Sequence, residues 1–201
     1  MHATIFDIDG TLLQSDASDD VLFLESVRYA LGDVKLRESW GLYTQFTAAG
    51  ILTEILRDND LEVTADRVSA VRNRFIEGVR RHVSEHGPFA EVPGALAFVK
   101  RLHTSTTHRI GYATGGWGGS ALFKLSLAGF PVERVPLASS DDHFERAQIM
   151  LCALAQLNTD FETVTYYGDG HWDAVAAKEL GWQFVPVGKK LAGLTRYASD
   201  A

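Results

Sequence analysis

Four short apolar runs divide the chain, at residues 3–7, 109–113, 163–168 and 183–187. Runs of this length, bounded by turn-forming residues, are typical of buried β-strands. Between them, residues 93–103 and 146–157 carry apolar side chains at helical spacing. Strands that alternate with helices predict an α/β fold, a doubly wound parallel sheet of the Rossmann-like type.

Residues 14–92 have a different pattern, in which no apolar run predicts a strand. Apolar residues recur there at helical spacing in two stripes, Ile51, Leu52, Ile55 and Leu56, and Val68, Val71, Phe75, Val79 and Val83. We therefore expect a small helical domain, residues 14–92, inserted into a core domain formed by residues 1–13 and 93–201. The residues expected at its helix N-caps are Asp19 or Asp20 in the first helix and Thr64 in a later one.

Two carboxylates, Asp7 and Asp9, close the first predicted strand. Open α/β sheets bind their ligands at the carboxyl ends of the strands, so these acids are candidates for chemistry. A plain Asp-rich turn is the simplest alternative. A calcium loop does not fit, because Thr11, Leu12 and Ser18 stand where it needs a carboxylate or amide, a Gly and a Glu.

Two later predicted strands also end in polar residues. Thr114 and Gly115 follow the strand at 109–113, and Asp169 follows the strand at 163–168. Asp173 comes four residues after Asp169, a spacing that places both carboxylates on one face if a helix begins there.

In this order, the motifs Asp7-x-Asp9-Gly-Thr, Thr114-Gly and Gly-Asp169-x-x-x-Asp173 resemble the first, second and fourth motifs of the haloacid dehalogenase-like hydrolases. In that family an insertion directly after the first motif is a C1 cap, which closes over the site. The resemblance therefore implies a Rossmann-like core with a cap domain at residues 14–92.

The resemblance also implies a reaction. Asp7 would attack phosphorus to form an aspartyl-phosphate, and Asp9 would protonate the leaving oxygen and then activate water. Because the phosphate and the nucleophile are both anions, a cation is needed, and Mg²⁺ suits a site of oxygen ligands. The implied ligands are Asp7, the backbone carbonyl of Asp9 and Asp169, with Asp173 as a ligand or a neighbour of the ligands. Thr114 and the amide of Gly115 would bind the phosphoryl oxygens.

The third motif departs from the family pattern, which has a Lys near the start of the helix before the fourth motif. No Lys occurs between Lys124 and Lys178, and Arg146 stands at the expected place. We expect Arg146 to supply the cation and to bind substrate, although Arg and Lys are not interchangeable. Lys124 is the second candidate, but its expected place is the solvated face of its helix.

The second acid indicates the reaction class. A haloacid dehalogenase lacks this acid because a halide leaves without a proton, so Asp9 favours hydrolysis of a phosphate monoester. A phosphomutase of the same superfamily is the nearest alternative. A catalytically weak member that acts as a binding or interaction subunit is a second one, because the family's Lys is missing.

Composition limits the partners. The 201 residues carry a formal charge of −7, which argues against a nucleic-acid or anionic-membrane surface. The single Cys152 excludes an internal disulfide, and no apolar run is long enough to span a membrane. We expect a soluble, cytoplasmic enzyme, monomeric or homodimeric, that acts on a small phosphorylated metabolite.

Some residues beside the motifs have two possible interpretations, one structural and one functional. Residues 116–121 match the G-x-G-x-x-G/A dinucleotide fingerprint, but they lie in mid-chain and no acid ends a following strand, so we do not expect a dinucleotide site. Trp117, His171 and Trp172 adjoin the motifs, and for each of them packing against the cap and contact with substrate remain open.

Overall fold

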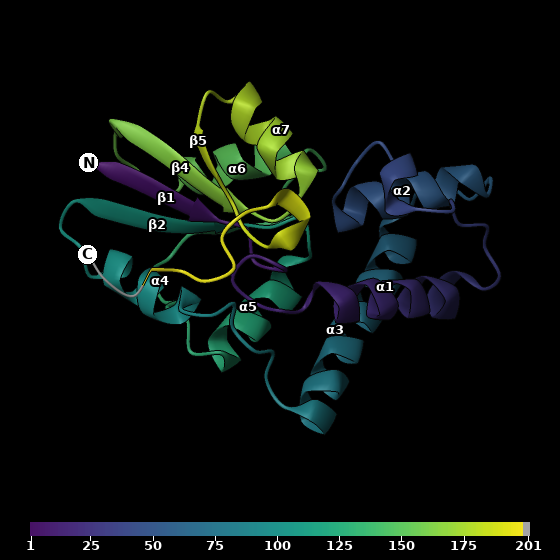
Figure 1. Ribbon diagram of the computed structural model, residues 1–201. Helices are drawn as coiled ribbons and strands as arrows, with labels where there is room; N and C mark the ends of the chain where they lie inside the picture. Colours follow the sequence, from purple (N-terminus) through teal and green to yellow (C-terminus); the bar gives the residue numbers. More distant parts are fainter. Residues whose placement is uncertain (199–201) are drawn as a thin grey trace.

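In the computed structural model, which describes residues 1–198, five parallel strands form one sheet in the order β3-β2-β1-β4-β5 (Figure 1). The strands are β1 (His2–Phe6), β2 (His108–Ala113), β3 (Leu137–Ala138), β4 (Thr163–Gly168) and β5 (Gln183–Pro186). The helices are α1 (Asp16–Leu31), α2 (Ala48–Asp58), α3 (Ala65–His86), α4 (Ala95–His103), α5 (Gly118–Leu127), α6 (Arg146–Ala155) and α7 (His171–Glu179), with the short 3-10 turns η1 (Trp40–Leu42) and η2 (Lys189–Leu191).

The sheet lies between two helical layers. Helices α4 and α5 cover one face, and α6 and α7 cover the other (Figure 1). Because neighbouring residues of a strand point to opposite faces, Phe6 joins the core on the α4–α5 side and Ile5 joins the core on the α6–α7 side. Both faces are apolar, as expected for a parallel sheet covered on both sides.

Helices α1, α2 and α3 follow β1 and stand beside the sheet rather than on either face (Figure 1). We refer to them as the helical insertion. Helix α1 packs along α3, and both contribute residues to the larger apolar core, including Val27 and Val79, which are fully buried. The insertion thus shares a continuous apolar interior with the α4–α5 side of the sheet.

The predicted architecture is confirmed, including the four apolar strands and the helices between them. Strand β3 was not predicted, because two residues are too few to carry a pattern. Thr64 is the N-cap of α3 and accepts the N–H of Arg67, as expected. The N-cap prediction for Asp19 or Asp20 is wrong, since α1 begins earlier, after Ser15.

None of the helices within residues 1–198 combines the length and the hydropathy that a membrane crossing requires.

Candidate active site

The candidate residues lie at the carboxyl ends of three adjacent strands. Asp7 follows β1, Thr114 follows β2 and Asp169 follows β4, and β1 lies between the other two in the sheet. Parallel pairing in register, with Phe6 opposite both Tyr112 and Tyr167, brings the three strand ends level. The sheet therefore brings Asp7 together with Thr114 and Asp169, which both lie more than 100 positions after it in the sequence.

Asp7 occupies the centre of this edge and is 3% exposed. Its Oδ2 accepts the hydroxyl of Thr11 at 3.2 Å, and its Oδ1 accepts Nη1 of Arg146 at 3.1 Å. Burial raises the pKa of Asp7 well above its ordinary value, Asp173 raises it further, and Arg146 opposes them. Asp7 is thus a carboxylate that a nearby cation would stabilise.

Asp7, Asp169 and Asp173 form a buried acidic cluster in which one oxygen from each lies within 4.8 Å of the others. Gly10 makes this approach possible, because its φ is +78° and a side chain there would collide with Asp169. Burial raises the pKa of Asp169 to about 6 and also raises the pKa of Asp173. Three crowded carboxylates with raised pKa values are suited to hold a hard divalent cation.

Asp173 is held more tightly than its two neighbours. Its Oδ2 accepts the N–H of Gly170 at 3.0 Å, and its Oδ1 accepts the hydroxyl of Tyr166 at 3.4 Å. Nε of Arg146 lies 3.3 Å from the same Oδ1. Asp169, in contrast, contacts the exposed Lys190, whose ammonium also pairs with Asp16 at 2.8 Å.

Arg146 is the first residue of α6, and its side chain is 9% exposed. The guanidinium bridges Asp7 and Asp173 and donates to the carbonyl of Phe46 at 3.5 Å. A Cβ on Gly115 would lie 2.6 Å from Nη2 of Arg146, so the glycine leaves room for the guanidinium. Arg146, the residue predicted for the third motif, therefore lies beside the candidate nucleophile Asp7. Its guanidinium contacts three groups at once.

Asp9 has two differently placed oxygens. Its Oδ1 accepts the hydroxyl of Ser15 at 2.5 Å and forms an ion pair with Lys124. Its Oδ2 lies over the second-motif loop, because a Cβ on Gly116 would be 3.5 Å from both this atom and Oγ1 of Thr114. One oxygen is thus anchored, while the other faces the loop of Thr114.

The expectation that Lys124 lies on a solvated helix face is wrong. Its side chain is 1% exposed, and its ammonium lies between Asp9 and Asp19. Burial opposes ionisation of Asp9, but the ammonium of Lys124, together with the hydrogen bonds from Ser15 and Asp19, lowers the Asp9 pKa. Burial and the charge of Asp9 raise the pKa of Asp19 to about 8. The spacing of apolar residues in α5 could have predicted this burial, because Lys124 lies on the same buried face of the helix as Ala121 and Leu125.

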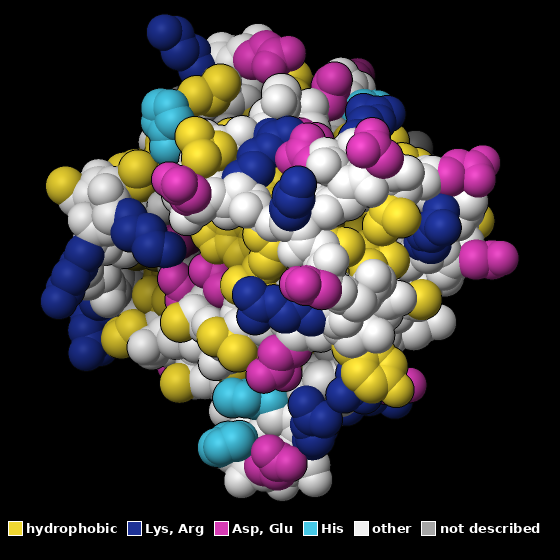
Figure 2. Space-filling view, turned by 90° about the vertical axis from the view of Figure 1, so that its right-hand side faces the viewer, with side chains coloured by type: hydrophobic (Ala, Val, Ile, Leu, Met, Phe, Trp, Pro, Cys, Tyr) yellow, Lys and Arg dark blue, Asp and Glu magenta, His cyan; other side chains and the backbone are white. Residues whose placement is uncertain are grey.

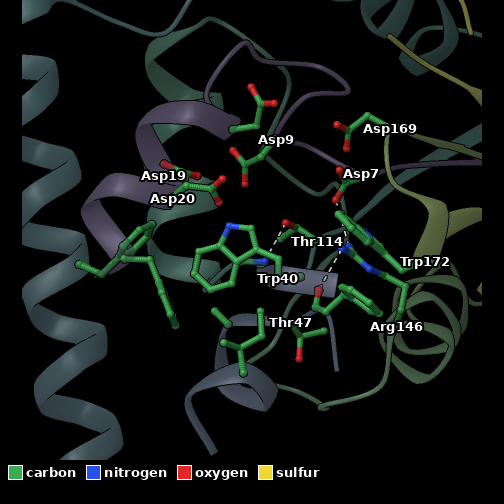
Figure 3. A pocket seen from close by; sticks show the side chains of 18 of the residues that line it. Asp7, Asp9, Asp19, Asp20, Trp40, Thr47, Thr114, Arg146, Asp169 and Trp172 are labelled. Atoms are coloured by element: carbon green, nitrogen blue, oxygen red, sulfur yellow. Dashed lines mark hydrogen bonds and ion pairs between the residues drawn. The ribbon is translucent and has the colours of Figure 1, made fainter. Parts of the chain in front are cut away.

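A cavity of about 230 Å³ opens over these groups. Asp7, Arg146 and Asp169 lie on one side of it, and Trp40, Asp19 and Asp20 lie on the other (Figure 3). The helical insertion supplies much of the lining that the motifs did not predict, namely Asp16, Asp19, Asp20, Phe23, Trp40, Phe46, Thr47, Ala48, Ile51 and Phe75.

The structure separates the three residues beside the motifs, Trp117, Trp172 and His171, by their positions. Trp117 is 1% exposed and packs against Phe23 and Phe75 of the insertion, with ring centroids 5.7 and 5.2 Å away. Trp172 lines the cavity and stacks on Phe46 at 4.8 Å. His171 is exposed at the start of α7. Trp117 is thus a packing residue, and Trp172 is available to a ligand.

The insertion is bonded to the core beside the cavity. The N–H of Ala48 donates to the carbonyl of Gly115 at 2.7 Å, and the hydroxyl of Thr47 donates to the carbonyl of Phe144 at 2.7 Å. Arg72 of α3 pairs with Asp141, in the loop after β3, at 2.9 Å. On the outer face of the insertion, cationic and acidic side chains are interspersed (Figure 2). The outer face therefore shows no broad cationic area in this view.

Comparisons with known proteins agree with this geometry. Residues 1–181 match the family model described as haloacid dehalogenase-like hydrolase. A comparison with curated protein sequences gave no match.

Solved structures share the fold at low sequence identity. A hydrolase from Pseudomonas syringae is 18% identical over 92% of this chain and 84% of that chain, with a TM-score of 0.71. A mutant of CbbY from Rhodobacter sphaeroides, in complex with xylulose-(1,5)bisphosphate, is 24% identical over 96% of this chain and 92% of that chain, with a TM-score of 0.68. β-Phosphoglucomutase from Clostridium difficile is 14% identical over 93% and 84%, with a TM-score of 0.71.

Proposed function

The chain belongs to the haloacid dehalogenase-like hydrolases, and from that premise we propose that it is a Mg²⁺-dependent phosphatase acting on a small phosphate monoester. The observation that carries the proposal is the convergence of Asp7, Asp9, Thr114 and Arg146 on one cavity. These residues supply a nucleophile, an acid, a hydroxyl donor and a fixed cation. Together they meet the needs of phosphoryl transfer.

The acidic cluster fits a magnesium ion. Asp7 and Asp169 would hold it, together with the backbone carbonyl of Asp9. Asp173 would be a further ligand or would orient the guanidinium of Arg146 and the loop of Asp169, since its oxygens contact Gly170, Tyr166 and Arg146. When bound, the metal neutralises charge on the phosphoryl oxygens and on the attacking carboxylate.

The residues then divide the reaction between them. The carboxylate of Asp7 attacks phosphorus, and the bond from phosphorus to the ester oxygen breaks. Arg146 and the hydroxyl of Thr114 stabilise the charge on the transferring group. Asp9 gives a proton to the leaving alcohol from Oδ2, and in the second step it takes a proton from the water that hydrolyses the aspartyl-phosphate.

Lys124 has a positioning role in this scheme. Its ammonium and the hydroxyl of Ser15 both hold Oδ1 of Asp9, which leaves Oδ2 as the oxygen that faces the second-motif loop. Asp19, which belongs to the insertion, forms a second ion pair with Lys124 and so balances its charge. We assign the insertion, residues 14–92, to a cap domain, because it closes the cavity opposite the strand ends.

Release of inorganic phosphate from 4-nitrophenyl phosphate, with Mg²⁺ and with a chelator, tests the function. We expect release that depends on Mg²⁺ and is abolished in Asp7→Asn, while Asp160→Asn, a change at an exposed loop residue, retains it. Phosphate transfer between sugar phosphates without release would identify a phosphomutase instead. Equal activity in Asp7→Asn and wild type would refute the assignment of the nucleophile.

A further inference from the structure

The cavity has a second wall that the phosphoryl chemistry does not use. Trp40 and Phe23 line it from the insertion, with ring centroids 5.8 Å apart in an edge-to-face arrangement. Phe46 and Trp172 form a stacked pair that also lines the cavity. This wall would contact the alcohol part of a phosphate ester whose phosphoryl group lies against Asp7.

The cationic side chains that line the cavity form ion pairs with carboxylates of the protein. Among the described residues that line it, the cationic ones are Arg146 and Lys190. Arg146 contacts Asp7 and Asp173, and Lys190 contacts Asp16 and Asp169. Within residues 1–198, the second wall therefore has no cation that is free of a carboxylate partner and could neutralise a carboxylate or a second phosphate on the substrate.

Asp20 gives this wall a negative charge. It lies on the same side of the cavity as Trp40, whose side chain hydrogen-bonds to its carboxylate (Figure 3). Asp20 is exposed, and the charge of Lys190 acts on it, but within the described residues no cationic side chain lies within 4.0 Å of its carboxylate, and the ammonium of Lys190 pairs with Asp16 and Asp169 instead. An acid beside aromatic rings is an environment that attracts an ammonium group, through the carboxylate and through the ring faces.

We propose that the substrate is the phosphate monoester of an amino alcohol, with its ammonium group held by Asp20 and the aromatic wall around Trp40. This inference rests on the proposed phosphatase function and adds the chemical class of the leaving group. Charge determines the ranking of substrates. A cationic alcohol is preferred, an uncharged alcohol of equal length comes second, and an anionic one is the poorest.

Three esters of two-carbon alcohols test the ranking, because they differ mainly in charge: phosphoethanolamine, ethyl phosphate and phosphoglycolate. We expect kcat/KM for phosphoethanolamine to exceed that for phosphoglycolate by about tenfold or more, as expected for one charge contact close to the protein surface. In Asp20→Lys this ratio falls by about tenfold or reverses. Asp33→Asn, which removes an exposed acid after α1 that does not line the cavity, leaves the ratio unchanged.

The possible failures are distinguishable. If wild type hydrolyses 4-nitrophenyl phosphate with Mg²⁺ but prefers phosphoglycolate, the inference is wrong and the phosphatase function stands. The same conclusion follows if Asp20→Lys keeps the wild-type ratio. If none of the esters is hydrolysed, including 4-nitrophenyl phosphate, both the proposed phosphatase function and the inference about the substrate are wrong.

Discussion

Replacing Lys124 by Met removes the buried ammonium and nearly preserves the length of the side chain. Asp9 and Asp19 then face each other without the cation that lies between them. The hydroxyl of Ser15 remains on Oδ1 of Asp9, but a single hydroxyl does not fix the carboxylate as an ion pair does. We expect both the stability of the fold and the proton transfer by Asp9 to suffer.

The magnitudes follow from burial. Lys124 is 1% exposed, and removing one partner of a buried ion pair costs about 3–5 kcal/mol of unfolding free energy. At roughly 2–4 °C per kcal/mol for a chain of this size, Tm falls by about 10 °C. General acid catalysis contributes a factor of about 10²–10⁴, and misplacing the acid forfeits part of it. For an alkyl phosphate we expect turnover to drop by roughly 10- to 100-fold.

The assay compares leaving groups. An alkoxide needs a proton to leave, whereas 4-nitrophenolate leaves without one, so Lys124→Met slows an alkyl phosphate far more than 4-nitrophenyl phosphate. Lys124→Arg, which keeps a cation, recovers part of the alkyl phosphatase activity. Lys100→Met, at an exposed position of α4, is the matched control and retains both activities.

Equal losses for both esters would refute the positioning role, because damage to the fold alone does not distinguish leaving groups. Retention of full activity on the alkyl ester by a folded Lys124→Met would refute it too. Partial unfolding of the variant does not obscure the result, since the ratio of the two rates is measured on the same sample.

Other predictions concern the metal, the guanidinium and the insertion. Asp169, with a pKa of about 6, must be deprotonated to bind Mg²⁺, so Mg²⁺ raises Tm more at pH 7.5 than at pH 5. Thermal denaturation shows this dependence in wild type, and Asp169→Asn loses it. Arg146→Ala lowers kcat by about 100-fold or more, and Arg146→Lys recovers part, in steady-state kinetics. Thr64→Ala costs about 1 kcal/mol in urea unfolding, and kcat is unchanged.

The sequence could predict that the candidate residues meet at one edge of the sheet, because they follow apolar strands. Asp7, Thr114 and Asp169 each come directly after such a run, and parallel strands bring their carboxyl ends to one edge. Arg146 could be placed by its position before the fourth motif. Its two carboxylate partners depend on tertiary packing, which local patterns do not contain.

The predictions from the sequence were wrong for polar residues that are buried in ion pairs. Lys124 reads as a surface charge, yet two carboxylates make its burial possible. Asp19 reads as an N-cap, yet Ser15 precedes the helix and Asp19 is turned toward Lys124. The lining from the insertion, such as Trp40, follows no motif, because its position depends on how α1 to α3 fold back over the strand ends.

The most direct test of the account is to trap the phosphorylated enzyme. Wild-type protein is mixed with a phosphate ester and Mg²⁺, quenched in acid within milliseconds, digested and analysed by mass spectrometry. The account predicts one phosphoryl group on the peptide that contains Asp7, formed and lost at rates compatible with turnover, and absent from Asp7→Asn. A phosphoryl group on another residue, or turnover by wild type with no phosphorylated peptide at any time, would contradict it.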